Sequence, residues 1–465
     1  MTTLRTACTP QLKTIHRGKV RDSLRVDDQS RLLVVSDRLS AFDRVLKTPI
    51  PMKGEVLSRL SNWWFERTAD IVPNHVLRVV DPIATQVREV KPILIEMVVR
   101  GYLTGSMGRA YAAGARSFCG AEVPDGLTPN ARFPEPLVTP TTKEKNDRPI
   151  TPDEIVSEGW TTAERFEQMR AIALRLFERG TQVLAEKGLI LVDTKYEFGL
   201  LGDDLILIDE IHTPDSSRMW AQTAYERDPL AVEAHDKEYV RAWLRDHRRD
   251  GEYPAELPED VVRETTRRYV DIFEQVTGQR LEIGTEDPRT RLARHLHAAG
   301  LIRDGFVAIV MGSPADIEHA NKMKAVIESH GIYADLRVCS AHKNGEDLPG
   351  LLAEYNEAVE PGAIIAVAGL SNGLGGALAA NSCLPVISCP PFKDGMDMLL
   401  NLNSSLMMPS AVPNMTVVRP KEAAAAALRA LNLPRLKDAF REEIVEMKNR
   451  LRYDDRQTRE AAHAE

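Results

Sequence analysis

The chain has 465 residues, which is too long for one ordinary domain, and 43% of them are hydrophobic, enough for well-packed cores. Its net charge of −8 argues against non-specific nucleic-acid binding, because that binding needs a basic surface. It has neither an apolar run of about 18 residues nor an apolar signal segment near the N-terminus, so we expect a cytoplasmic protein with no nucleic-acid or membrane partner.

The five cysteines are scattered and odd in number, and none belongs to a Cys-x-x-Cys pair. Disulfide frameworks and zinc sites both need more regular spacing. We therefore expect small buried thiols in a reducing compartment. They are Cys8, Cys119, Cys339, Cys383 and Cys389.

Residues 1–285 have the mixed pattern of an α+β domain. Short apolar runs predict strands, and apolar residues at helical spacing predict amphipathic helices. We expect strands at 31–37 and 91–103, a strand and hairpin within 189–213, and helices at 162–187, 236–246 and 258–276. The first of these helices follows the capping residues Thr161 and Thr162 and stops at Gly188.

The second half of the chain has a different pattern. A polar segment at 286–304 is the expected linker, 305–432 the second domain, and 433–465 a helical tail that forms a surface or subunit contact. Continuous apolar strands alternate with helices, which indicates an α/β fold with a parallel sheet covered on both faces. The strands are expected at 306–312, 334–340, 363–369 and 384–390, and helices at 316–329 and 346–357.

The hairpin region brings acidic side chains together. Alternation along DTKYEFG puts Asp193, Lys195 and Glu197 on one face and Val192, Thr194, Tyr196 and Phe198 on the other. If residues 202–204 form a three-residue loop, Leu201 pairs with Leu205 and Glu197 lies opposite Asp209. Acids about 5 Å apart repel each other, so we expect a cation between them. Magnesium prefers carboxylate and phosphate oxygens and is the natural candidate.

A solvated hairpin whose acidic side chains are neutralised by Lys195 and water explains this spacing about as well as a metal site does. The following string HTPDSSR favours a site, because it packs a carboxylate, two hydroxyls and a guanidinium into four residues. These are Asp215, Ser216, Ser217 and Arg218.

Five strings in the first half then form a recognisable series. They are GKVRD (18–22), SDRLSAFD (36–43), MVVRGYLTGS (97–106), DTKYEFGL (193–200) and DEIHTPDSSRMW (209–220). In this order they resemble the SAICAR synthetase (phosphoribosylaminoimidazole-succinocarboxamide synthase) family over most of residues 10–245. The resemblance implies an ATP-grasp or kinase-like α+β fold. It also implies a ligase that uses ATP to join a ribonucleotide carboxylate to L-aspartate through an acyl phosphate.

The resemblance further implies a role for individual residues. For ATP they are Gly18, Lys19, Arg21, Glu96, Val98 and a catalytic Lys195; for magnesium, Glu197 and Asp209; for the ribonucleotide or aspartate, Ser36, Asp37, Arg38, Arg100, Ser106, Asp215 and Arg218. A structural ion pair is the alternative for Arg100, and a solvated helix face for a later motif formed by Asp236, Lys237 and Arg241. Where the family carries an acidic, histidine-containing loop, this chain has PTTKEKNDRPIT (140–151), in which Lys143 and Asp147 would take its place.

Three strings follow predicted strands of the second half. Ser313, Pro314 and Asp316 fit the start of a helix, whose free N–H groups attract anions, although an ordinary cap explains them too. SAHK (340–343) and AGLSNGLGG (368–376) follow the next two strands. Ligands gather where parallel strands end, so the three strings should meet in one crevice. His342 is then a candidate acid or base.

Together with PVISCPP these strings resemble the PurE family of aminoimidazole ribonucleotide carboxylases, which have a three-layer, flavodoxin-like fold. Gly373 stands where the bacterial mutase form has a histidine, which matches the form that carboxylates directly with carbon dioxide or bicarbonate. Ala315 replaces a usual serine. The resemblance implies that His342 is the base and that Lys343 faces the new carboxylate. The residues implied for substrate are Gly312, Ser313, Asp316, Ser340, Ser371, Asn372, Gly373 and Gly375.

The expected function is therefore two consecutive steps of purine synthesis, a carboxylation (lyase) and an ATP-dependent ligation. ATP and magnesium are the expected cofactors, with neither biotin nor flavin, and a homo-octamer is expected through the PurE-like domain. Three alternatives stay open: another ATP-dependent ligase or kinase-like phosphotransferase, a non-catalytic sugar-phosphate-binding module, and a mutase acting on the N-carboxylated ribonucleotide.

Overall fold

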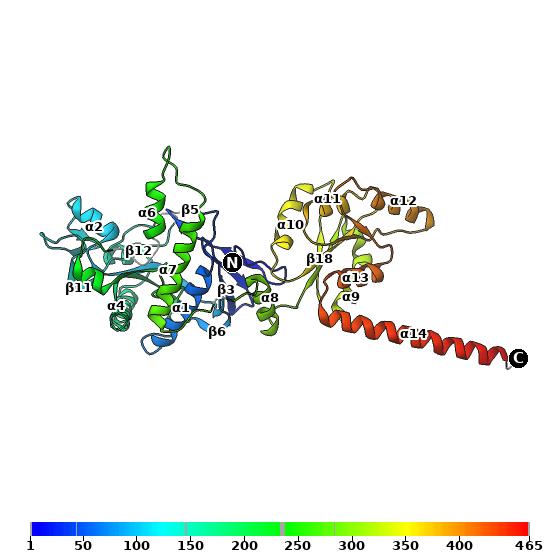
Figure 1. Cartoon of the computed structure of the whole chain (residues 1–465), viewed down its shortest axis with the longest axis horizontal. Coiled ribbons are helices and arrows are strands. Elements are labelled where there is room, and N and C mark those ends of the chain that lie inside the picture. The colour runs from blue at the N-terminus through cyan, green and yellow to red at the C-terminus, as the bar shows by residue number, and fades with distance from the viewer. Residues whose placement is uncertain (1, 43, 145–146, 233–237, 283, 464–465) are drawn as a thin grey trace. The chain divides into compact units, whose positions relative to one another are not determined.

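The computed structural model describes residues 2–42, 44–144, 147–232, 238–282 and 284–463 (Figure 1). It divides into two compact units: unit 1 comprises Met1–Ala7 and Thr14–Leu292, and unit 2 comprises Cys8–Lys13 and Ala293–Glu465. The division falls inside the segment expected as a linker, most of which is helix α8 (Pro288–Ala298). Among the described helices, none is both long and apolar enough to cross a membrane.

Unit 1 contains two main antiparallel sheets and several helices. The first sheet, in the order β1-β2-β3-β7-β6, is built from β1 (Thr14–Arg17), β2 (Arg21–Arg25), β3 (Ser30–Val35), β6 (Val76–Asp81) and β7 (Ala84–Arg88). The second is built from β8 (Lys91–Tyr102), β11 (Arg132–Val138), β12 (Thr141–Thr142), β13 (Leu189–Leu201), β14 (Asp204–Ile208) and β15 (Ser217–Ala221). Two short pairs join β4 (Ser40–Ala41) to β5 (Arg44–Val45) and β9 (Ser117–Phe118) to β10 (Ala121–Glu122).

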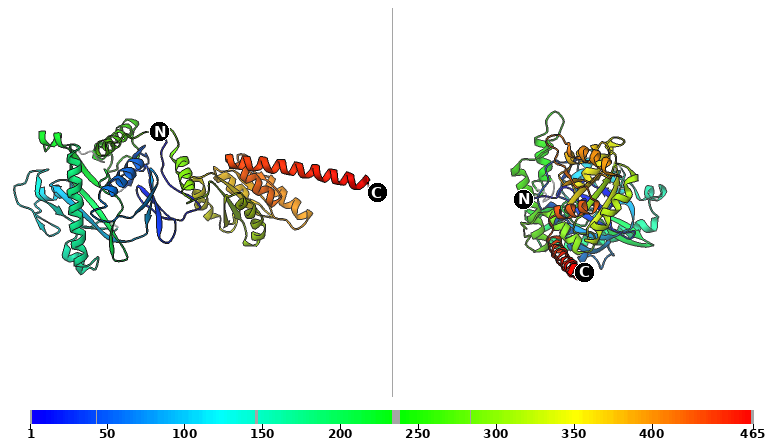
Figure 2. Two further views of the ribbon diagram at one scale, coloured as in Figure 1. Left: turned by 90° about the horizontal axis from the view of Figure 1, so that it is seen from below. Right: turned by 90° about the vertical axis from the view of Figure 1, so that its right-hand side faces the viewer.

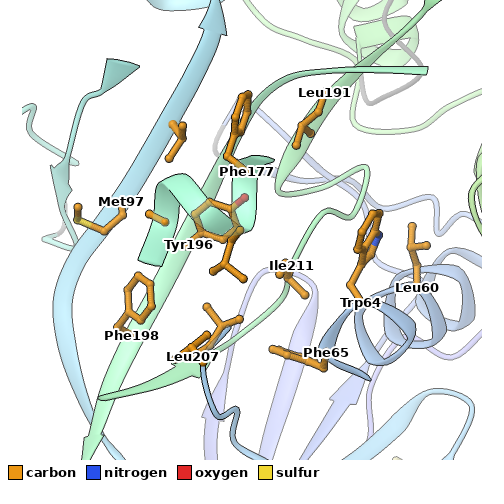
Figure 3. Close-up of a cluster of buried hydrophobic side chains, with 14 of the residues drawn as sticks. Leu60, Trp64, Phe65, Met97, Phe177, Leu191, Tyr196, Phe198, Leu207 and Ile211 are labelled. Atoms are coloured by element: carbon orange, nitrogen blue, oxygen red, sulfur yellow. The ribbon is translucent and has the colours of Figure 1, made fainter. Parts of the chain in front are cut away.

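The helices of unit 1 are α1 (Lys53–Arg67), α2 (Gly105–Ala112), α3 (Pro152–Ser157), α4 (Ala163–Ala185), α5 (Gln222–Arg227), α6 (Glu238–Asp246) and α7 (Glu259–Thr277). The amphipathic helix α4 begins after its cap Thr162, as its sequence predicts. Its apolar face packs on the second sheet, and side chains of α1, α4, β8 and β13 form the main core (Figure 3). This core supports the strands that carry the acidic side chains.

The hairpin between β13 and β14 differs from the expected one by one residue. Leu201 pairs with Asp204 and not with Leu205, so the loop has two residues instead of three. Gly202 takes the first loop position with φ +61°, which matches a type II′ turn. The prediction of a three-residue loop is therefore wrong.

A β-bulge also changes which side of the sheet the side chains of β13 face. The pairing with β15 is interrupted between residues 191 and 193. Tyr196 and Phe198 pack in the main core, whereas Val192 belongs to a separate cluster with aromatic neighbours (Figure 3). A bulge inserts one residue and reverses the alternation beyond it. The expectation that Val192 shares a face with Tyr196 is therefore wrong.

Unit 2 has a five-stranded parallel sheet in the order β17-β16-β18-β19-β20. Its strands are β16 (Phe306–Met311), β17 (Tyr333–Val338), β18 (Gly362–Val367), β19 (Val386–Ser388) and β20 (Met415–Thr416). Its helices are α9 (Ile317–Ser329), α10 (Leu348–Asn356), α11 (Gly373–Asn381), α12 (Gly395–Leu406), α13 (Pro420–Ala430) and α14 (Pro434–His463), with short 3₁₀ turns at Pro314–Asp316 and Gly345–Asp347. Four strands were expected, and β20 adds a fifth at the edge.

Alternating residues of each strand in unit 2 enter two separate cores. Val307 and Ile309 of β16 pack against α9 and α13, whereas Phe306 and Ala308 pack against α10 and α11. Figure 1 shows these helix pairs on opposite sides of β18. The three-layer, flavodoxin-like architecture expected for this half is therefore confirmed.

The tail forms one long helix, α14, of 30 residues. Its first turns pack on α13 through Leu436 and Phe440, both buried. From residue 441 to 462 every side chain is exposed, and Figure 2 shows this part of α14 stretching away from the sheet of its unit.

Candidate active sites

Two acidic side chains lie near the open end of the β13–β14 hairpin in unit 1 and interact electrostatically. Because of the shifted register, Glu197 pairs with Ile208 and not with Asp209. Asp209 follows the end of β14 with φ +69°, a left-handed conformation that breaks the alternation of the strand. Its charge nevertheless acts on Glu197. The two acids thus interact electrostatically, although the pairing predicted from the sequence is wrong.

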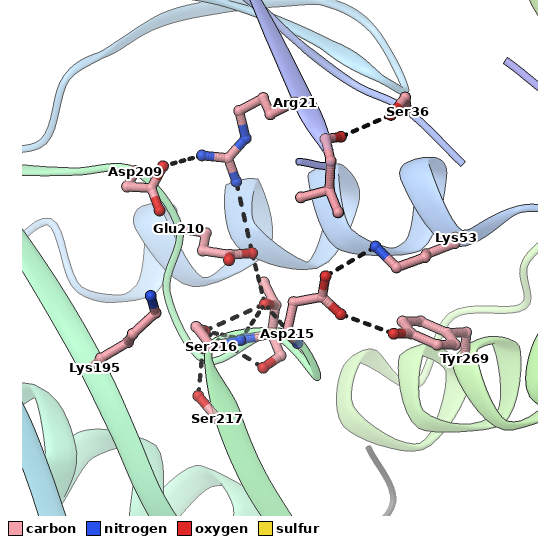
Figure 4. A network of polar contacts seen from close by, with 12 residues as sticks. Arg21, Ser36, Lys53, Lys195, Asp209, Glu210, Asp215, Ser216, Ser217 and Tyr269 are labelled. Atoms are coloured by element: carbon pink, nitrogen blue, oxygen red, sulfur yellow. Dashed lines mark hydrogen bonds and ion pairs between the residues drawn. The ribbon is translucent and has the colours of Figure 1, made fainter. Parts of the chain in front are cut away.

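Basic side chains surround this pair. Lys143 forms an ion pair with Glu197. Arg21 forms one with Asp209 (Figure 4). Burial, followed by the charge of Asp209, raises the pKa of Glu197 to about 8, although Lys143 and Lys195 oppose the shift. Two acids that disfavour each other's ionisation form a place where positive charge is stabilised.

The pair fits a hard divalent cation that arrives with other oxygen ligands. The described part of the chain contains no group of three or more His, Cys, Asp or Glu side chains arranged to hold a metal. Magnesium is commonly bound by one or two carboxylates together with substrate phosphates and water. Glu197 and Asp209 would therefore hold magnesium together with nucleotide phosphates.

The hairpin between β1 and β2 carries Gly18, Lys19 and Arg21, which the sequence resemblance assigns to ATP. The N–H of Gly18 donates to the carbonyl of Arg21 at 2.8 Å and closes the turn that contains Lys19. Ser36 donates to the backbone of this hairpin at 2.9 Å, and Arg38 donates to the carbonyl of Gly18 at 3.0 Å. Ser36 and Arg38 thus hold the hairpin in place.

Asp37 has a different environment from its two neighbours. Its carboxylate accepts the backbone N–H groups of Leu4 at 2.9 Å and of Gly54, near the start of α1, at 3.0 Å. Burial raises its pKa to about 6. Asp37 was expected near the nucleotide or aspartate; in this structure it joins the N-terminal segment to α1.

Strand β8 runs beside β13 and carries two further expected residues. Val98 lies opposite Lys195, and Glu96 lies opposite Glu197. Lys195 donates to Glu96 at 2.8 Å. Burial lowers the pKa of Lys195, but Glu96 and Glu197 outweigh it and raise the pKa above its usual value. Lys195 therefore keeps its positive charge.

A basic cleft of about 1130 Å³ lies within unit 1. Ser106 and Arg218, both predicted from the sequence, line it. Gly105 has φ +62°, and a Cβ there would be 2.8 Å from Nη1 of Arg218, so the glycine leaves room for the guanidinium at the start of α2. The other arginines of the lining are Arg109, Arg241, Arg245 and Arg268.

Arg100 lies behind this cleft and does not line it. Asp193 bridges the two predicted arginines, 3.6 Å from Arg100 and 3.0 Å from Arg218. This geometry is that of the structural ion pair considered as the alternative for Arg100. Asp236 and Lys237 lie outside the described residues.

Asp215 is more enclosed than a residue of an open cleft. Its side chain is 2% exposed, 2.8 Å from the buried ammonium of Lys53, and accepts the hydroxyl of Tyr269 at 2.8 Å (Figure 4). Sequence reasoning missed both partners, because they come from α1 and α7. The only signal for Lys53 was a Lys-Gly pair at the start of an amphipathic helix.

Unit 2 has its own crevice, of about 680 Å³, at the carboxyl ends of the parallel strands. The predicted residues that line it are Gly312, Ser313, Asp316, Ser340, His342, Lys343 and Ser371. The three predicted strings therefore converge. Sequence reasoning missed a fourth loop, residues 391–394 after β19, which the same rule about strand ends would have included.

Three predicted residues lie beneath the crevice and do not line it. The side chain of Asn372 is buried and caps α11 by accepting the N–H of Gly375 at 3.1 Å. A Cβ at Gly375 would be 2.2 Å from the hydroxyl of Ser388, and one at Gly373 would be 2.8 Å from the ring of His342. These residues give the loop its shape, and Gly373 makes room for His342.

Comparison with known families identifies both units. Residues 14–257 match the SAICAR synthetase family model, and residues 306–453 match the AIR carboxylase family model. Together with the folds, these matches define a two-domain enzyme of purine biosynthesis with a ligase unit and a carboxylase-type unit. The chain belongs to the SAICAR synthetase family, and its second domain is an AIR carboxylase domain of the PurE type.

Individual relatives agree with the family match. The putative phosphoribosylaminoimidazole-succinocarboxamide synthase 2 of Agrobacterium fabrum is 42% identical over 305 residues, which cover 62% of this chain and 96% of that protein. The corresponding synthase of Legionella pneumophila (strain Lens) is 45% identical over 276 residues, covering 57% and 88%. The structure of the SAICAR synthase from Saccharomyces cerevisiae in complex with SAICAR is 31% identical, with a TM-score of 0.55 and coverage of 60% and 99%.

Proposed function

We propose that the two units catalyse consecutive steps. Unit 2 carboxylates aminoimidazole ribonucleotide, and unit 1 joins the resulting carboxylate to L-aspartate with ATP. The observation that carries the proposal is the convergence of His342 and Lys343 with the helix start at Ser313 in one crevice, in a chain whose other unit presents paired acids, Glu197 and Asp209, beside Lys195.

In the ligase step, the ribonucleotide carboxylate attacks the γ-phosphorus of ATP, and the bond to ADP breaks. The amine of aspartate then attacks the acyl phosphate, phosphate leaves, and the amine loses a proton. Lys195 and the Gly18–Arg21 turn would bind phosphate oxygens, while Arg218 and Ser106 would bind the ribonucleotide. Magnesium, held by Glu197 and Asp209, would supply positive charge at the phosphates.

In the carboxylation step, ring carbon 4 of the electron-rich aminoimidazole attacks carbon dioxide. The new carbon–carbon bond leaves a proton on the same carbon, and its removal restores the aromatic ring. His342 would accept that proton, and Lys343 would stabilise the new carboxylate. Ser313 and the helix start would bind the ribose phosphate.

Direct carboxylation is favoured over a mutase reaction by the packing at Gly373. A Cβ at this position would be 2.8 Å from the ring of His342, so a histidine there would require the His342 side chain to shift. The present position of His342 therefore suits a chain in which residue 373 has no side chain. Equal or faster turnover of the N-carboxylated ribonucleotide than of bicarbonate would favour the mutase instead.

An octamer built through unit 2 is part of the proposal. Large apolar side chains are exposed along and just after α12, and such a patch commonly marks a protein interface. They are Met396 (70%), Leu399 (52%), Leu400 (62%), Leu406 (60%) and Met407 (82%).

A coupled assay tests the function. The full chain is given aminoimidazole ribonucleotide, bicarbonate, ATP, magnesium and aspartate, and the succinocarboxamide product is detected by mass spectrometry. His342→Ala should abolish formation from aminoimidazole ribonucleotide but not from its carboxylated derivative. The ligase assignment fails if ADP release does not depend on aspartate, and the carboxylase assignment fails if His342→Ala carboxylates normally.

A further inference from the structure

A histidine is buried at the centre of the loop that carries the acids of unit 1. This acidic loop, residues 209–216, connects β14 to β15 and contains Asp209 and Asp215. His212 has none of its surface exposed. Asp209 has φ +69° and His212 has φ +48°, conformations that cost energy in residues with a Cβ. A loop with two such positions must be held by its surroundings.

Two aromatic residues of the main core hold the imidazole. Nε2 of His212 lies 2.6 Å from the hydroxyl of Tyr196 in β13. The ring of Trp64 in α1 packs edge-on against it, with centroids 4.6 Å apart. Figure 3 shows Tyr196 and Trp64 on either side of Ile211, the loop residue that precedes His212. The middle of the acidic loop is therefore anchored to a rigid strand and a rigid helix.

A glycine in the middle of α4 makes room for this ring. A Cβ at Gly180 would be 2.5 Å from Cε1 of His212. Glycine in a helix interior costs about 1 kcal/mol relative to alanine. The lack of a side chain at Gly180 therefore costs helix stability and lets His212 and Leu191 pack closely against the helix.

The ring is neutral and makes a single polar contact. Burial lowers the pKa of His212 to about 3, and within the described structure its Nδ1 is buried with no hydrogen-bond partner. The hydrogen bond to Tyr196 is thus the interaction that fixes the rotation of the ring. Losing it would leave a buried polar atom unsatisfied, which is costly enough to let the ring and the loop shift.

We propose that His212, oriented by Tyr196, is a positioning residue for the ligase site: it sets the acidic loop so that Asp209 faces Glu197. The inference rests on the proposed role of Asp209 in holding magnesium. It adds that the affinity for metal and nucleotide depends on a buried pair that touches neither. A histidine that only filled the core would affect stability and leave that affinity unchanged.

Tyr196→Phe tests the proposal with the loss of one oxygen atom. In the full chain, titration calorimetry measures the binding of Mn²⁺ together with a non-hydrolysable ATP analogue. We expect the dissociation constant of the metal to rise about 5- to 10-fold, the size of one net hydrogen bond. Excess magnesium should restore the kcat of the ligase reaction, which it would not do for damage to the core alone.

Gly180→Ala tests it from the opposite side of the ring. The added methyl group would lie 2.5 Å from Cε1 of His212 and 2.8 Å from Leu191, so both side chains must move. We expect a weaker metal site from the displaced ring, although alanine itself favours the helix. Tyr111→Phe is the matched control. It removes a tyrosine hydroxyl that donates to the carbonyl of Pro124 at 2.7 Å elsewhere in unit 1, and it should leave the metal affinity unchanged.

The results separate this inference from the proposed function. Wild-type affinity in both Tyr196→Phe and Gly180→Ala overturns the positioning role while leaving the function intact. A wild-type chain that binds the analogue without any metal dependence overturns the function, and the inference falls with it. If Tyr196→Phe folds poorly, Gly180→Ala alone decides.

Discussion

Gly373 gives the carboxylase unit room for its candidate base. A Cβ at this position would lie 2.8 Å from Cε1 and 3.0 Å from Nε2 of His342. Both distances are shorter than van der Waals contact allows, so the imidazole would have to move. Any side chain at 373 therefore competes with His342 for the same space.

Gly373→Ala should accordingly lower carboxylation without affecting ligation. A displacement of about 1 Å in a reacting group can cost about 100-fold in rate, so a loss of roughly 10- to 100-fold is expected. Separate assays of the two reactions measure it. Gly350→Ala is the control, since a Cβ at Gly350 meets nothing within 4 Å. Equal carboxylation by the two variants would contradict the role of Gly373.

The buried ion pair between Lys53 and Asp215 makes a second prediction for a single residue. Lys53→Met keeps most of the volume but removes the charge that lies 2.8 Å from the Asp215 carboxylate. Breaking a buried pair from one side costs about 3–5 kcal/mol, and urea unfolding of unit 1 should show a loss of this size. The exposed Lys91→Met should stay within about 0.5 kcal/mol of wild type. Similar losses in both variants would show that the pair contributes little.

Lys53 also shows the limit of sequence reasoning. The motifs located Asp215 and Asp209 because their neighbours in the chain are polar and closely spaced. Lys53 lies 162 residues from Asp215 in the sequence and reaches it only through tertiary packing. No local pattern distinguishes such a partner from an ordinary core residue.

Among the elements, the β13–β14 hairpin shows a correct expectation reached through a wrong register. The sequence predicted a strand, a tight loop and a second strand, because alternation and Gly-Asp-Asp are local signals. Loop length depends on the backbone angles of Gly202, which the sequence does not specify. Asp209 then adopts a left-handed φ that residue spacing could not reveal.

The strands of unit 2 were easier to predict. Each is a continuous apolar run because both faces of the sheet are covered, and each ends at polar or glycine-rich residues. The carboxyl ends of parallel strands share one edge, so the crevice followed from the order of the strands alone. The loop after β19 was overlooked although it obeys the same rule.

The segment Cys8–Lys13 belongs to unit 2, although the chain on both sides of it belongs to unit 1. The side chain of Gln11 exchanges two hydrogen bonds with the backbone of Arg303, at 2.8 and 3.0 Å. The hydroxyl of Thr9 donates to the buried carboxylate of Glu360. Burial raises the pKa of Glu360 from 4.5 to about 6, while Thr9 and Gln11 oppose the shift.

This carboxylate predicts a pH dependence for the stability of unit 2. Between pH 4.5 and about 6 the folded state holds a proton that the unfolded state has released, so the contribution of Glu360 to stability falls as pH rises through this window. The full change is at most about 2 kcal/mol. Glu360→Gln stays neutral, so its free energy of unfolding relative to wild type should increase by up to that amount from pH 4.5 to pH 7. Parallel pH profiles would refute this.

In the whole molecule, each proposed reaction depends on one unit. All residues of the basic cleft belong to unit 1, and all residues of the strand-end crevice belong to unit 2. A substitution in one unit can therefore be judged against the activity of the other in the same preparation. This internal comparison separates loss of a site from loss of the protein.

The exposed face of α12 predicts how the carboxylase activity depends on assembly. Leu370 and Phe392, which line the crevice, are 80% and 39% exposed, and α12, the helix with the exposed apolar side chains, contributes Asp397 and Asn401 to the same lining. If copies of unit 2 cover the exposed face of α12, Leu400→Lys should shift the mass in native mass spectrometry from an octamer to smaller species, because a buried charge opposes association. Carboxylation should fall by at least about tenfold, since a displacement near the reacting groups can cost 100-fold. Ligation should be unchanged.

Val79→Lys provides the matched control for Leu400→Lys. Val79 lies on β6 of unit 1 and is 51% exposed, so the same change is made at an apolar surface position outside α12. Its assembly and both of its activities should equal those of wild type. A Leu400→Lys chain that keeps the wild-type mass would show that α12 is not the interface. If it dissociates yet carboxylates normally, the crevice is complete within one copy and assembly serves another purpose.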